Sequence, residues 1–353
     1  MTRSRSSAAA FLGVSLSASI LLASCTTATP PASPPSGMGG TETISTGLAA
    51  PWSVVFHNGT PLVSERDSAR VLELAKDGTA RAIGTIEGVE AAGEGGLLGM
   101  AVDEQGRLYV CSTTAEGNRI ERFTITGEPG SLALGQADTI LEKVPSASNH
   151  NGGRIAFGPD GMLYATTGDA GARNLAQDLN SLGGKILRMT PDGAVPEDNP
   201  FSGSLVYSYG HRNPQGLAWA EDGTMFATEF GQNTWDELNV ITAGANYGWP
   251  TVEGIATAEG FTDPVQQWAP EAASPSGMTQ LDGMLYIANL RGQVLRAVPV
   301  ADPSTSTSYF SAEFGRLRDV TVAPDGALWF LTNNTDGRGN PGAEDDRILA
   351  VVP

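Results

Sequence analysis

Residues 158–167 have the sequence "GPDGMLYATT", a tight-turn sequence followed at once by an apolar run. An Asp-Gly or Asn-Gly pair ahead of such a run is a strong hairpin signal, because glycine accepts the positive φ that the turn requires. The signature occurs six times, in "HNGTPLVSE", "DEQGRLYVCS", "GPDGMLYATT", "AEDGTMFATE", "TQLDGMLYIAN" and "APDGALWFLT". The turn glycines are separated by 47, 55, 62, 60 and 43 residues and are Gly59, Gly106, Gly161, Gly223, Gly283 and Gly326.

Each copy is followed by a second strand-like segment, such as "GKILRMTPDG" or "GQVLRAVPV". Six strand–turn–strand units of about fifty residues are typical of four-stranded blades around an axis. We therefore predict an all-β fold, a six-bladed β-propeller over residues 44–353. A large β-sandwich is the alternative, which the six regular units disfavour. Loops at one end of a propeller converge, so residues far apart in the sequence can share one site.

The N-terminus has the features of an export signal. Arg3 and Arg5 precede an uncharged apolar stretch that is too short for a confident membrane span, which predicts a signal peptide over residues 1–24. The tetrad ending at Cys25 resembles a bacterial lipobox, in which the cysteine is acylated; ordinary secretory cleavage is the alternative. Residues 25–43 then form a Pro/Ser/Thr-rich linker. We expect an extracytoplasmic lipoprotein that meets the membrane only through its lipid anchor.

The chain is acidic, with a formal charge of −18 that becomes −20 once Arg3 and Arg5 are removed with the leader. Such a charge disfavours binding to nucleic acid or anionic lipid. It suits hard cations such as calcium, although solubility alone also explains acidic residues. With Cys25 acylated, Cys111 has no partner for a disulfide within the chain.

His150 is one of only three histidines, and it comes directly before a predicted strand. Asp169 follows the next strand, and a hairpin brings its two ends together. A carboxylate that accepts a hydrogen bond from one imidazole nitrogen fixes the tautomer and makes the other nitrogen a better base. The alternative is a histidine that caps a turn near an aspartate in a loop.

Arginines cluster near the ends of several predicted strands. Arg212 and Asn213 precede Pro214, which favours an extended Asn213. Arg316 and Arg318 are two residues apart, a spacing that places both on one face of a strand, and Arg291 lies near the same edge of the preceding repeat. Together they indicate an anion site; ion pairs between blades are the alternative.

The segment "EFGQNTWDELNVITAGANYGWP" gathers Glu229, Asp236 and Glu237 among turns rich in glycine. Calcium sites have this character, and so do ordinary acidic loops, because the spacing is not that of an EF-hand.

Taken together, these segments resemble the bacterial soluble aldose dehydrogenases, the family of soluble glucose dehydrogenase and the glucose/sorbosone dehydrogenases. The resemblance runs from Leu48 to the end of the chain, and its most specific phrases are "EGGLLGMA", "NHNGGRIAFGPDG", "TTGDAG", "SLGGKILR", "GHRNPQGLAW", "ANYGWP", "PSGM" and "RLRDVTVAPDG". Members of this family are six-bladed propellers that use pyrroloquinoline quinone (PQQ) and calcium.

The resemblance implies roles for the residues singled out above. His150 corresponds to the general base, which takes the proton of the anomeric hydroxyl while C1 delivers hydride to the quinone, and Asp169 corresponds to its partner. Arg212 and Asn213 correspond to the pair that contacts the quinone near its reactive carbonyl. The implied product is a lactone, and the electrons pass to an external acceptor.

The family's cofactor carries three carboxylates, which Arg316, Arg318 and Arg291 would hold. The sequence departs from the family at Glu94, where relatives often carry glutamine just before the "GGLLG"-like phrase. A carboxylate at this position would repel an anionic cofactor unless it is protonated or paired with an arginine.

The resemblance also implies two calcium positions. The main-chain oxygens of Gly231 and Gln232 correspond to ligands of the calcium that contacts PQQ. Glu237 and Tyr247 correspond to ligands of a nearby structural calcium, for which Asp236 is a weaker candidate.

The sequence thus predicts a PQQ- and calcium-dependent aldose dehydrogenase, with an aldose as substrate. Two other functions stay open at this point. One is a propeller without catalytic activity that binds a carbohydrate or a protein, and the other is a calcium-dependent lactonase that needs no PQQ.

Overall fold

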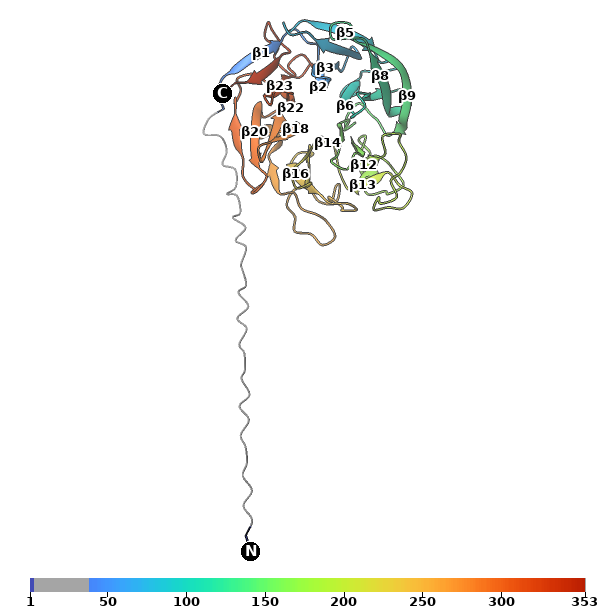
Figure 1. The fold of residues 1–353 in the computed structure, drawn as a ribbon, viewed down its shortest axis with the longest axis vertical. Coiled ribbons are helices and arrows are strands. Elements are labelled where there is room, and N and C mark those ends of the chain that lie inside the picture. The colour runs from blue at the N-terminus through green and yellow to red at the C-terminus, as the bar shows by residue number, and fades with distance from the viewer. Residues whose placement is uncertain (3–37, 353) are drawn as a thin grey trace. The chain divides into compact units, whose positions relative to one another are not determined.

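A computed structural model of the chain describes residues 1–2 and 38–352. Cys25, nearly all of the predicted signal peptide and most of the predicted linker lie outside these residues. Residues 38–352 form six four-stranded antiparallel sheets arranged in a ring, as Figure 1 shows. The predicted six-bladed β-propeller is therefore confirmed. Within the described residues, no helix has the length and apolar character needed to cross a membrane.

The blades follow one another along the chain, each built in the order of its strands. The first three blades contain β2 (Pro51–His57), β3 (Thr60–Glu65), β4 (Arg70–Leu74) and β5 (Ala80–Thr85); β6 (Leu97–Val102), β7 (Leu108–Thr114), β8 (Gly117–Thr126) and β9 (Ala133–Val144); and β10 (Ile155–Phe157), β11 (Leu163–Thr167), β12 (Lys185–Met189) and β13 (Val206–Tyr209).

The next two blades have the same order, and two short 3₁₀ helices lie in the loops. These elements are β14 (Pro214–Trp219), β15 (Met225–Glu229), β16 (Asp236–Ile241) and β17 (Gln266–Trp268); β18 (Pro275–Leu281), β19 (Met284–Asn289), β20 (Val294–Pro299) and β21 (Thr307–Tyr309); η1 (Arg173–Ala176) and η2 (Pro270–Ala272).

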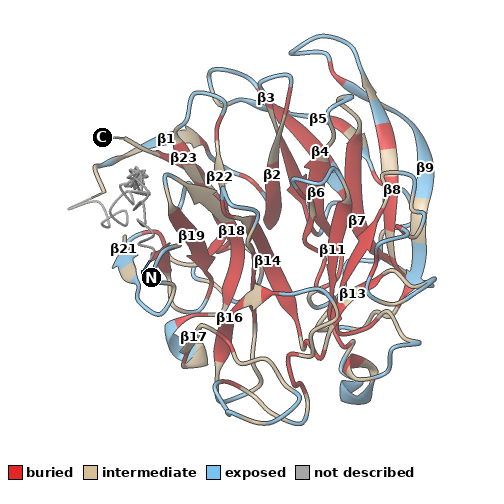
Figure 2. Ribbon diagram, turned by 60° about the horizontal axis from the view of Figure 1, so that its bottom comes forward, coloured by how far each residue is buried: buried red, intermediate tan, exposed pale blue. Residues whose placement is uncertain are grey.

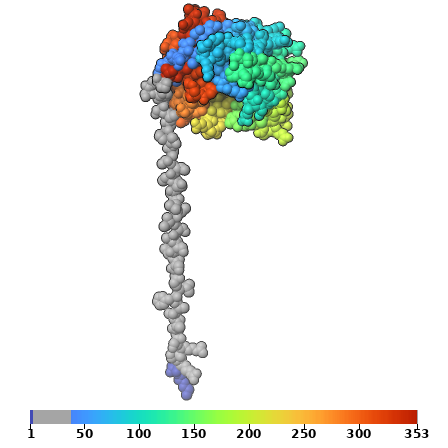
Figure 3. Space-filling model, turned by 45° about the horizontal axis from the view of Figure 1, so that its top comes forward, coloured from blue at the N-terminus to red at the C-terminus, as the bar shows by residue number. Residues whose placement is uncertain are grey.

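The last blade closes the ring with strands from both ends of the propeller. It consists of β22 (Leu317–Val322), β23 (Leu328–Thr332), β24 (Ile348–Val351) and β1 (Thr41–Ser45). β1 pairs antiparallel with β24, so residues near the start of the propeller lie beside the last ones, as the blue and red surfaces of Figure 3 show. β1 begins inside the stretch that the sequence analysis assigned to the linker.

The six turn glycines have the conformation that the sequence predicts. All have positive φ, between +72° and +88°. An added Cβ at Gly59 or Gly161 would meet nothing within 4 Å, so backbone conformation rather than crowding accounts for glycine there. These turns follow the first strand of each blade. The loops that lead into the first strands lie at the opposite end of the propeller.

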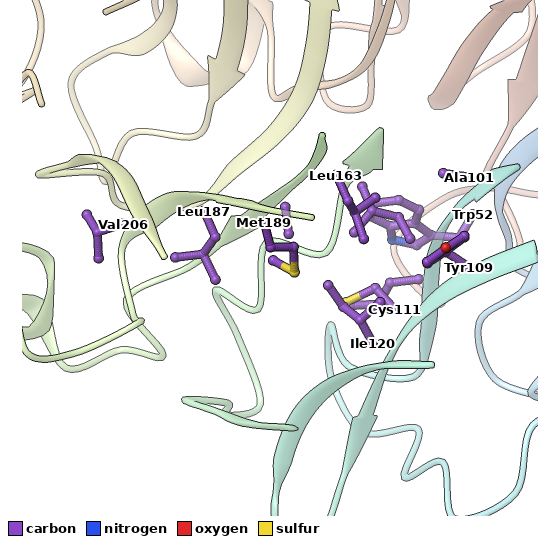
Figure 4. Close-up of a cluster of buried hydrophobic side chains, with 12 residues drawn as sticks. Trp52, Ala101, Tyr109, Cys111, Ile120, Leu163, Leu187, Met189 and Val206 are labelled. Carbon is purple, nitrogen blue, oxygen red and sulfur yellow. The ribbon is translucent and has the colours of Figure 1, made fainter. Parts of the chain in front are cut away.

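Apolar side chains fill the spaces between neighbouring blades, which is why the strands in Figure 2 are mostly buried. Figure 4 shows one such cluster, in which Trp52, Tyr109 and Leu163 from three successive blades belong to the same core. Cys111 belongs to this cluster as a free, buried thiol. Burial raises the pKa of the Cys111 thiol to about 12, so it is a packing residue.

Candidate active site

His150 and Asp169 lie at the two ends of the β10–β11 hairpin, as the sequence predicts. Nδ1 of His150 lies 2.6 Å from Oδ1 of Asp169, whose side chain is completely buried. The short distance to a carboxylate places the proton of the neutral imidazole on Nδ1 and leaves a lone pair on Nε2. His150 therefore has the arrangement of a general base with its orienting carboxylate.

Trp249 completes this arrangement, and the sequence analysis gave it no role. Its indole Nε1 donates a 2.8 Å hydrogen bond to Oδ2 of Asp169, and the backbone N–H of Gly171 donates to Oδ1 at 2.8 Å. Burial opposes ionisation of Asp169, but the hydrogen bonds from His150 and Trp249 outweigh it and lower the pKa of that carboxyl. Asp169 is thus held as a carboxylate by donors on each side.

Lys185 is a second residue that the sequence analysis missed. It is fully buried, and its Nζ donates to the carbonyl oxygens of Leu175 at 2.6 Å, Gly183 at 2.7 Å and Ala176 at 3.1 Å. These bonds hold the loop between β11 and β12 against the start of β12, the strand that carries Lys185. Burial lowers the pKa of Lys185 to about 8. Its role is to fix the loop that carries Asp169.

Arg212 and Asn213 are joined to the His150 hairpin by hydrogen bonds. The N–H of Asp169 donates to the carbonyl of Arg212 at 2.9 Å, and Oδ1 of Asn213 accepts the N–H of Gly152 at 3.0 Å. Nε of Arg212 and Nδ2 of Asn213 are buried and have no hydrogen-bond partner within the described part of the chain. Buried donors of this kind are candidates for binding a polar ligand.

Arg212 also differs from the structural arginine that was its alternative interpretation. Among the described residues it forms no ion pair with a carboxylate. Its Nη1 donates to the carbonyl of Phe230 at 3.1 Å, and its guanidinium lies 5.4 Å from the centroid of the Trp249 ring. Burial lowers the pKa of Arg212, yet a guanidinium stays charged in proteins.

Arginines also line a cavity of about 450 Å³ between the last two blades. Arg291, Arg316 and Arg338 are among its lining residues. Nη2 of Arg316 is paired with the buried Asp336 at 3.1 Å, and its Nε has no partner within residues 38–352. The first two arginines were predicted from the sequence, but Arg338 was not.

Glu94 connects this cavity to His150. Its Oε2 accepts the backbone N–H of His150 at 3.0 Å, and its Oε1 accepts Nη1 of Arg338 at 3.1 Å. The departure from the family's glutamine is thus accompanied by an arginine partner, which was one of the two conditions that the sequence analysis set for a carboxylate here.

Arg318 lies deeper than Arg316, because a register shift interrupts the β22–β23 ladder between Leu317 and Asp319. The side chain of Arg318 is buried, and its Nη1 donates to Oε1 of Gln215 at 2.8 Å. Gln215 lies at a register shift of its own in β14. Burial lowers the pKa of Arg318 to about 9. The two-residue spacing did not predict this, because a bulge changes where a side chain is directed.

The loop after β15 presents two backbone carbonyls. The N–H of Gly231 donates to Asp236 and the N–H of Gln232 donates to Glu253, both at 2.8 Å. The carbonyl oxygens of Gly231 and Gln232 accept no hydrogen bond from residues 38–352. Asp236 also accepts the N–H of Ser274 at 2.6 Å, so both of its oxygens brace loops. The carbonyls, rather than Asp236, are available to a cation.

A small cavity lies beside this loop. Glu229, Glu237 and Glu253 line a cavity of about 10 Å³, close to the volume of one water-sized sphere. Burial and the neighbouring Glu229 raise the pKa of Glu237. The hydroxyl of Tyr247 donates to the carbonyl of Val240 at 2.6 Å, so its side chain is structural and only its main-chain oxygen could be a ligand.

Within the described residues, no three His, Cys, Asp or Glu side chains are arranged to hold a metal ion. A calcium ion in this region would therefore depend on backbone carbonyls as well as carboxylates, which calcium accepts readily.

The site therefore contains an oriented imidazole between a cavity lined by arginines and a small cavity lined by glutamates. Direct hydrogen bonds link His150 to Asp169 and Glu94, and Asp169 to Arg212. Arg338 extends this network to the arginine-lined cavity, and Arg212 extends it to the cavity lined by the glutamates. This arrangement can accept a proton from a substrate while binding an anion nearby.

Comparison with known proteins identifies the family of this chain. The model of the glucose/sorbosone dehydrogenase family matches residues 48–340. The aldose sugar dehydrogenase YliI of Escherichia coli is 30% identical over 339 residues, which cover 84% of this chain and 90% of that protein. Quinoprotein glucose dehydrogenase B of Acinetobacter calcoaceticus is 31% identical over 238 residues, which cover 56% of this chain and 49% of that protein.

Among solved structures, the PQQ-bound form of an aldose sugar dehydrogenase from Streptomyces coelicolor is 47% identical to this chain. The two superpose with a TM-score of 0.85 over 90% of this chain and 99% of that one. The family match extends over nearly the whole propeller. The chain belongs to the glucose/sorbosone dehydrogenase family.

Proposed function

We propose that the chain is a PQQ- and calcium-dependent aldose dehydrogenase, which oxidises the C1 hydroxyl of an aldose to the lactone and passes the electrons to an external acceptor. Family membership and the similarity to a PQQ-bound aldose sugar dehydrogenase support this function. The observation that carries it is the 2.6 Å contact between Nδ1 of His150 and the fully buried Asp169.

His150 has the role of the general base in this proposal. Asp169 holds the proton on Nδ1, so Nε2 takes the proton of the C1 hydroxyl. The imidazolium that forms is stabilised by the adjacent carboxylate, which Trp249 and Gly171 keep ionised and in place. Besides this proton, oxidation of C1 releases two electrons together with the hydrogen on C1, and a bound cofactor would have to accept them.

The described residues fit an anionic cofactor. Bound PQQ would supply the two-electron acceptor that no side chain can provide. Arg291, Arg316 and Arg338 would attract its carboxylates, since guanidinium groups bind carboxylates through planar paired donors. The unpartnered Nε of Arg212 and Nδ2 of Asn213 would donate hydrogen bonds to it.

The described residues also fit calcium. The free carbonyl oxygens of Gly231 and Gln232 are ligands of the kind that calcium prefers, and Glu229, Glu237 and Glu253 lie next to them. Bound calcium would supply a Lewis acid near the cofactor and neutralise part of this negative charge.

Reconstitution tests the proposal. Purified apo-protein is titrated with PQQ and calcium, and reduction of a dye is followed with a panel of aldoses. We expect turnover only with both cofactors and an aldose present. Lactone hydrolysis with calcium alone would favour the lactonase, and failure to bind PQQ at micromolar concentration would favour a propeller that binds without catalysis.

Substitution of His150 tests the base directly. We expect His150→Ala to abolish turnover while PQQ affinity stays within about threefold of wild type, because the arginines remain. His57→Gln is the matched control, since His57 is a buried histidine at the turn end of the first blade. Retained turnover in His150→Ala would remove the assignment of the base.

We also propose that the reaction takes place outside the cytoplasm, with the protein anchored by a lipid at Cys25. The support is the predicted signal peptide and lipobox-like tetrad. Membrane fractionation of wild type and Cys25→Ser tests this: the wild type should be found with membranes and the variant in the soluble fraction.

A further inference from the structure

Both carboxylate oxygens of Glu94 accept hydrogen bonds from other residues of the protein. Oε2 accepts the N–H of His150 at 3.0 Å, and Oε1 accepts Nη1 of Arg338 at 3.1 Å. The side chain of Glu94 is 18% exposed, whereas that of Arg338 is 51% exposed. Burial opposes the charge on Glu94, but the bonds from His150 and Arg338 outweigh it and lower the pKa of this carboxyl. Glu94 is therefore an ionised residue that contacts the backbone of the proposed base.

The backbone of His150 needs such a partner. Its φ is +58°, a left-handed conformation that is unfavourable for a residue with a side chain. The loop that carries Glu94 is packed tightly against this segment. The N–H of Glu94 donates to the carbonyl of Ser148 at 2.9 Å, and a Cβ on Gly93 would lie 2.1 Å from the same oxygen.

The negative charge of Glu94 affects ligand binding independently of its hydrogen bond to His150. Arg338 lines the same cavity as Arg291 and Arg316, where the proposed cofactor would place its carboxylates. An unpaired carboxylate at Glu94 would repel that anion, while a neutral acceptor in the same place would not. Arg338 removes this penalty, since it pairs with Glu94 at the edge of the cavity.

We propose that Glu94 and Arg338 are a matched pair of positioning residues: Glu94 fixes the peptide of His150, and Arg338 neutralises Glu94 so that an anionic cofactor can bind beside it. This inference rests on the proposed function for its second half only. Its two halves separate experimentally, because glutamine keeps the acceptor oxygen of Glu94 without the charge.

The charge half is tested by PQQ affinity, measured from quenching of tryptophan fluorescence in apo-protein with calcium. We expect Arg338→Ala to weaken PQQ binding about tenfold at low salt and less at 1 M NaCl, where charges are screened. Adding Glu94→Gln to Arg338→Ala should restore affinity to within about threefold of wild type, because the uncompensated charge is gone.

Arg81→Ala is the control, because Arg81 is another half-exposed arginine paired with a buried glutamate, Glu73, on an outer strand. It should leave PQQ affinity unchanged. If Arg338→Ala binds PQQ as tightly as wild type, or if the double variant does not regain affinity for PQQ, the proposal that Arg338 neutralises Glu94 is overturned.

The positioning half is tested without cofactor, by amide hydrogen exchange at His150 in the apo-protein. We expect Glu94→Ala to accelerate exchange at least about tenfold, and Glu94→Gln to leave it near the wild-type rate. Equal rates in all three proteins would overturn this half. Failure of wild type to bind PQQ would overturn the proposed function and the role of Arg338, but the exchange rates would still decide the role of Glu94.

Discussion

His150 takes its orientation from a short chain of hydrogen bonds that continues into the protein. Nδ1 of His150 contacts one oxygen of Asp169 at 2.6 Å, and the indole of Trp249 donates to the other oxygen at 2.8 Å. A carboxylate held on both sides cannot rotate without losing a bond. Trp249 thus acts through Asp169, in the way that outer partners orient the groups that contact substrate.

Trp249→Phe removes the indole N–H and keeps a ring of similar shape. We expect kcat to fall about tenfold or more, while PQQ affinity changes less than about threefold, because the ring still packs beside Arg212. Trp219→Phe is the control, since its ring packs edge-on against Tyr164 at the turn end of β14, away from His150. Unchanged kcat in Trp249→Phe would show that Asp169 needs no second donor.

The sequence predicted some of these residues and not others for a physical reason. His150 and Asp169 flank one hairpin, so the alternation of turn and strand brings them together. Trp249 and Arg338 reach the site from loops 80 and 244 residues away from their partners. The loops that carry Trp249 and Arg338 have no periodic sequence pattern. No local feature of the sequence therefore predicts their contacts with Asp169 and Glu94.

At the level of elements, glycine serves two different purposes in this propeller. Gly59 occupies a hairpin turn at φ +81°, with open space where a Cβ would be. Gly93 has a similar φ of +62°, but a Cβ there would lie 2.1 Å from the carbonyl oxygen of Ser148. The first glycine is required by conformation alone, and the second also by the close approach of two loops.

Alanine substitution separates these purposes. We expect Gly59→Ala to lower the free energy of unfolding by about 1 kcal/mol and leave kcat unchanged. Gly93→Ala should lower it by more than about 2 kcal/mol and reduce kcat about tenfold, because the loop that carries Glu94 must move away from His150. Denaturant unfolding and steady-state kinetics measure both. Equal effects of the two substitutions on kcat would contradict the close-approach argument.

The sequence pattern did not predict the β-bulges. The alternation of turn and strand predicted where the inner strands lie, but not the register shifts near their first residues. Arg318, Gln215 and Ser276 are the residues at three of these shifts, and their side chains bond to one another in the interior. A period of two cannot predict this contact, because a bulge breaks the period where the site begins.

At the level of the whole molecule, closure of the ring depends on β1. Its residues pair with β24 from Thr41↔Val351 to Ser45↔Ile348, which joins the two ends of the propeller. From the sequence, Thr41 was assigned to the linker, because β1 has no turn glycine of its own and its partner lies at the other end of the chain. Closure of the ring depends on pairing between strands from opposite ends of the propeller, which a local sequence pattern does not predict.

Two truncations test this closure. Deleting residues 1–37 leaves β1 and the core contact of Met38 intact and should keep the unfolding temperature of the full chain. Deleting residues 1–45 exposes the edge of β24, so we expect the unfolding temperature to fall by about 5 °C or more and self-association to appear. Calorimetry and size-exclusion chromatography measure the two effects. An equal unfolding temperature in both truncations would mean that β24 is stable as an edge strand.

The buried acids near the proposed calcium site make stability depend on pH and metal together. Burial raises the pKa of Asp236 from 3.8 to about 6, and burial with the charge of Glu229 raises the pKa of Glu237 above its usual 4.5. Between the unfolded and folded pKa values, the native state holds protons that the unfolded state has released. Asp236 and Glu237 therefore contribute a fall in the free energy of unfolding of the apo-protein as the pH rises from about 4 through their raised folded pKa values.

Calcium should reverse this fall, because it binds the ionised carboxylates of the native state and adds stability as they lose their protons. We expect calcium to raise the unfolding temperature more at pH 8 than at pH 5, relative to protein in EGTA. Glu237→Gln should flatten the pH dependence of the apo-protein and reduce the calcium effect, since the neutral amide has no proton to release. A calcium effect that is equal at both pH values, or unchanged by Glu237→Gln, would separate Glu237 from the metal and leave the backbone carbonyls of Gly231 and Gln232 as its principal ligands.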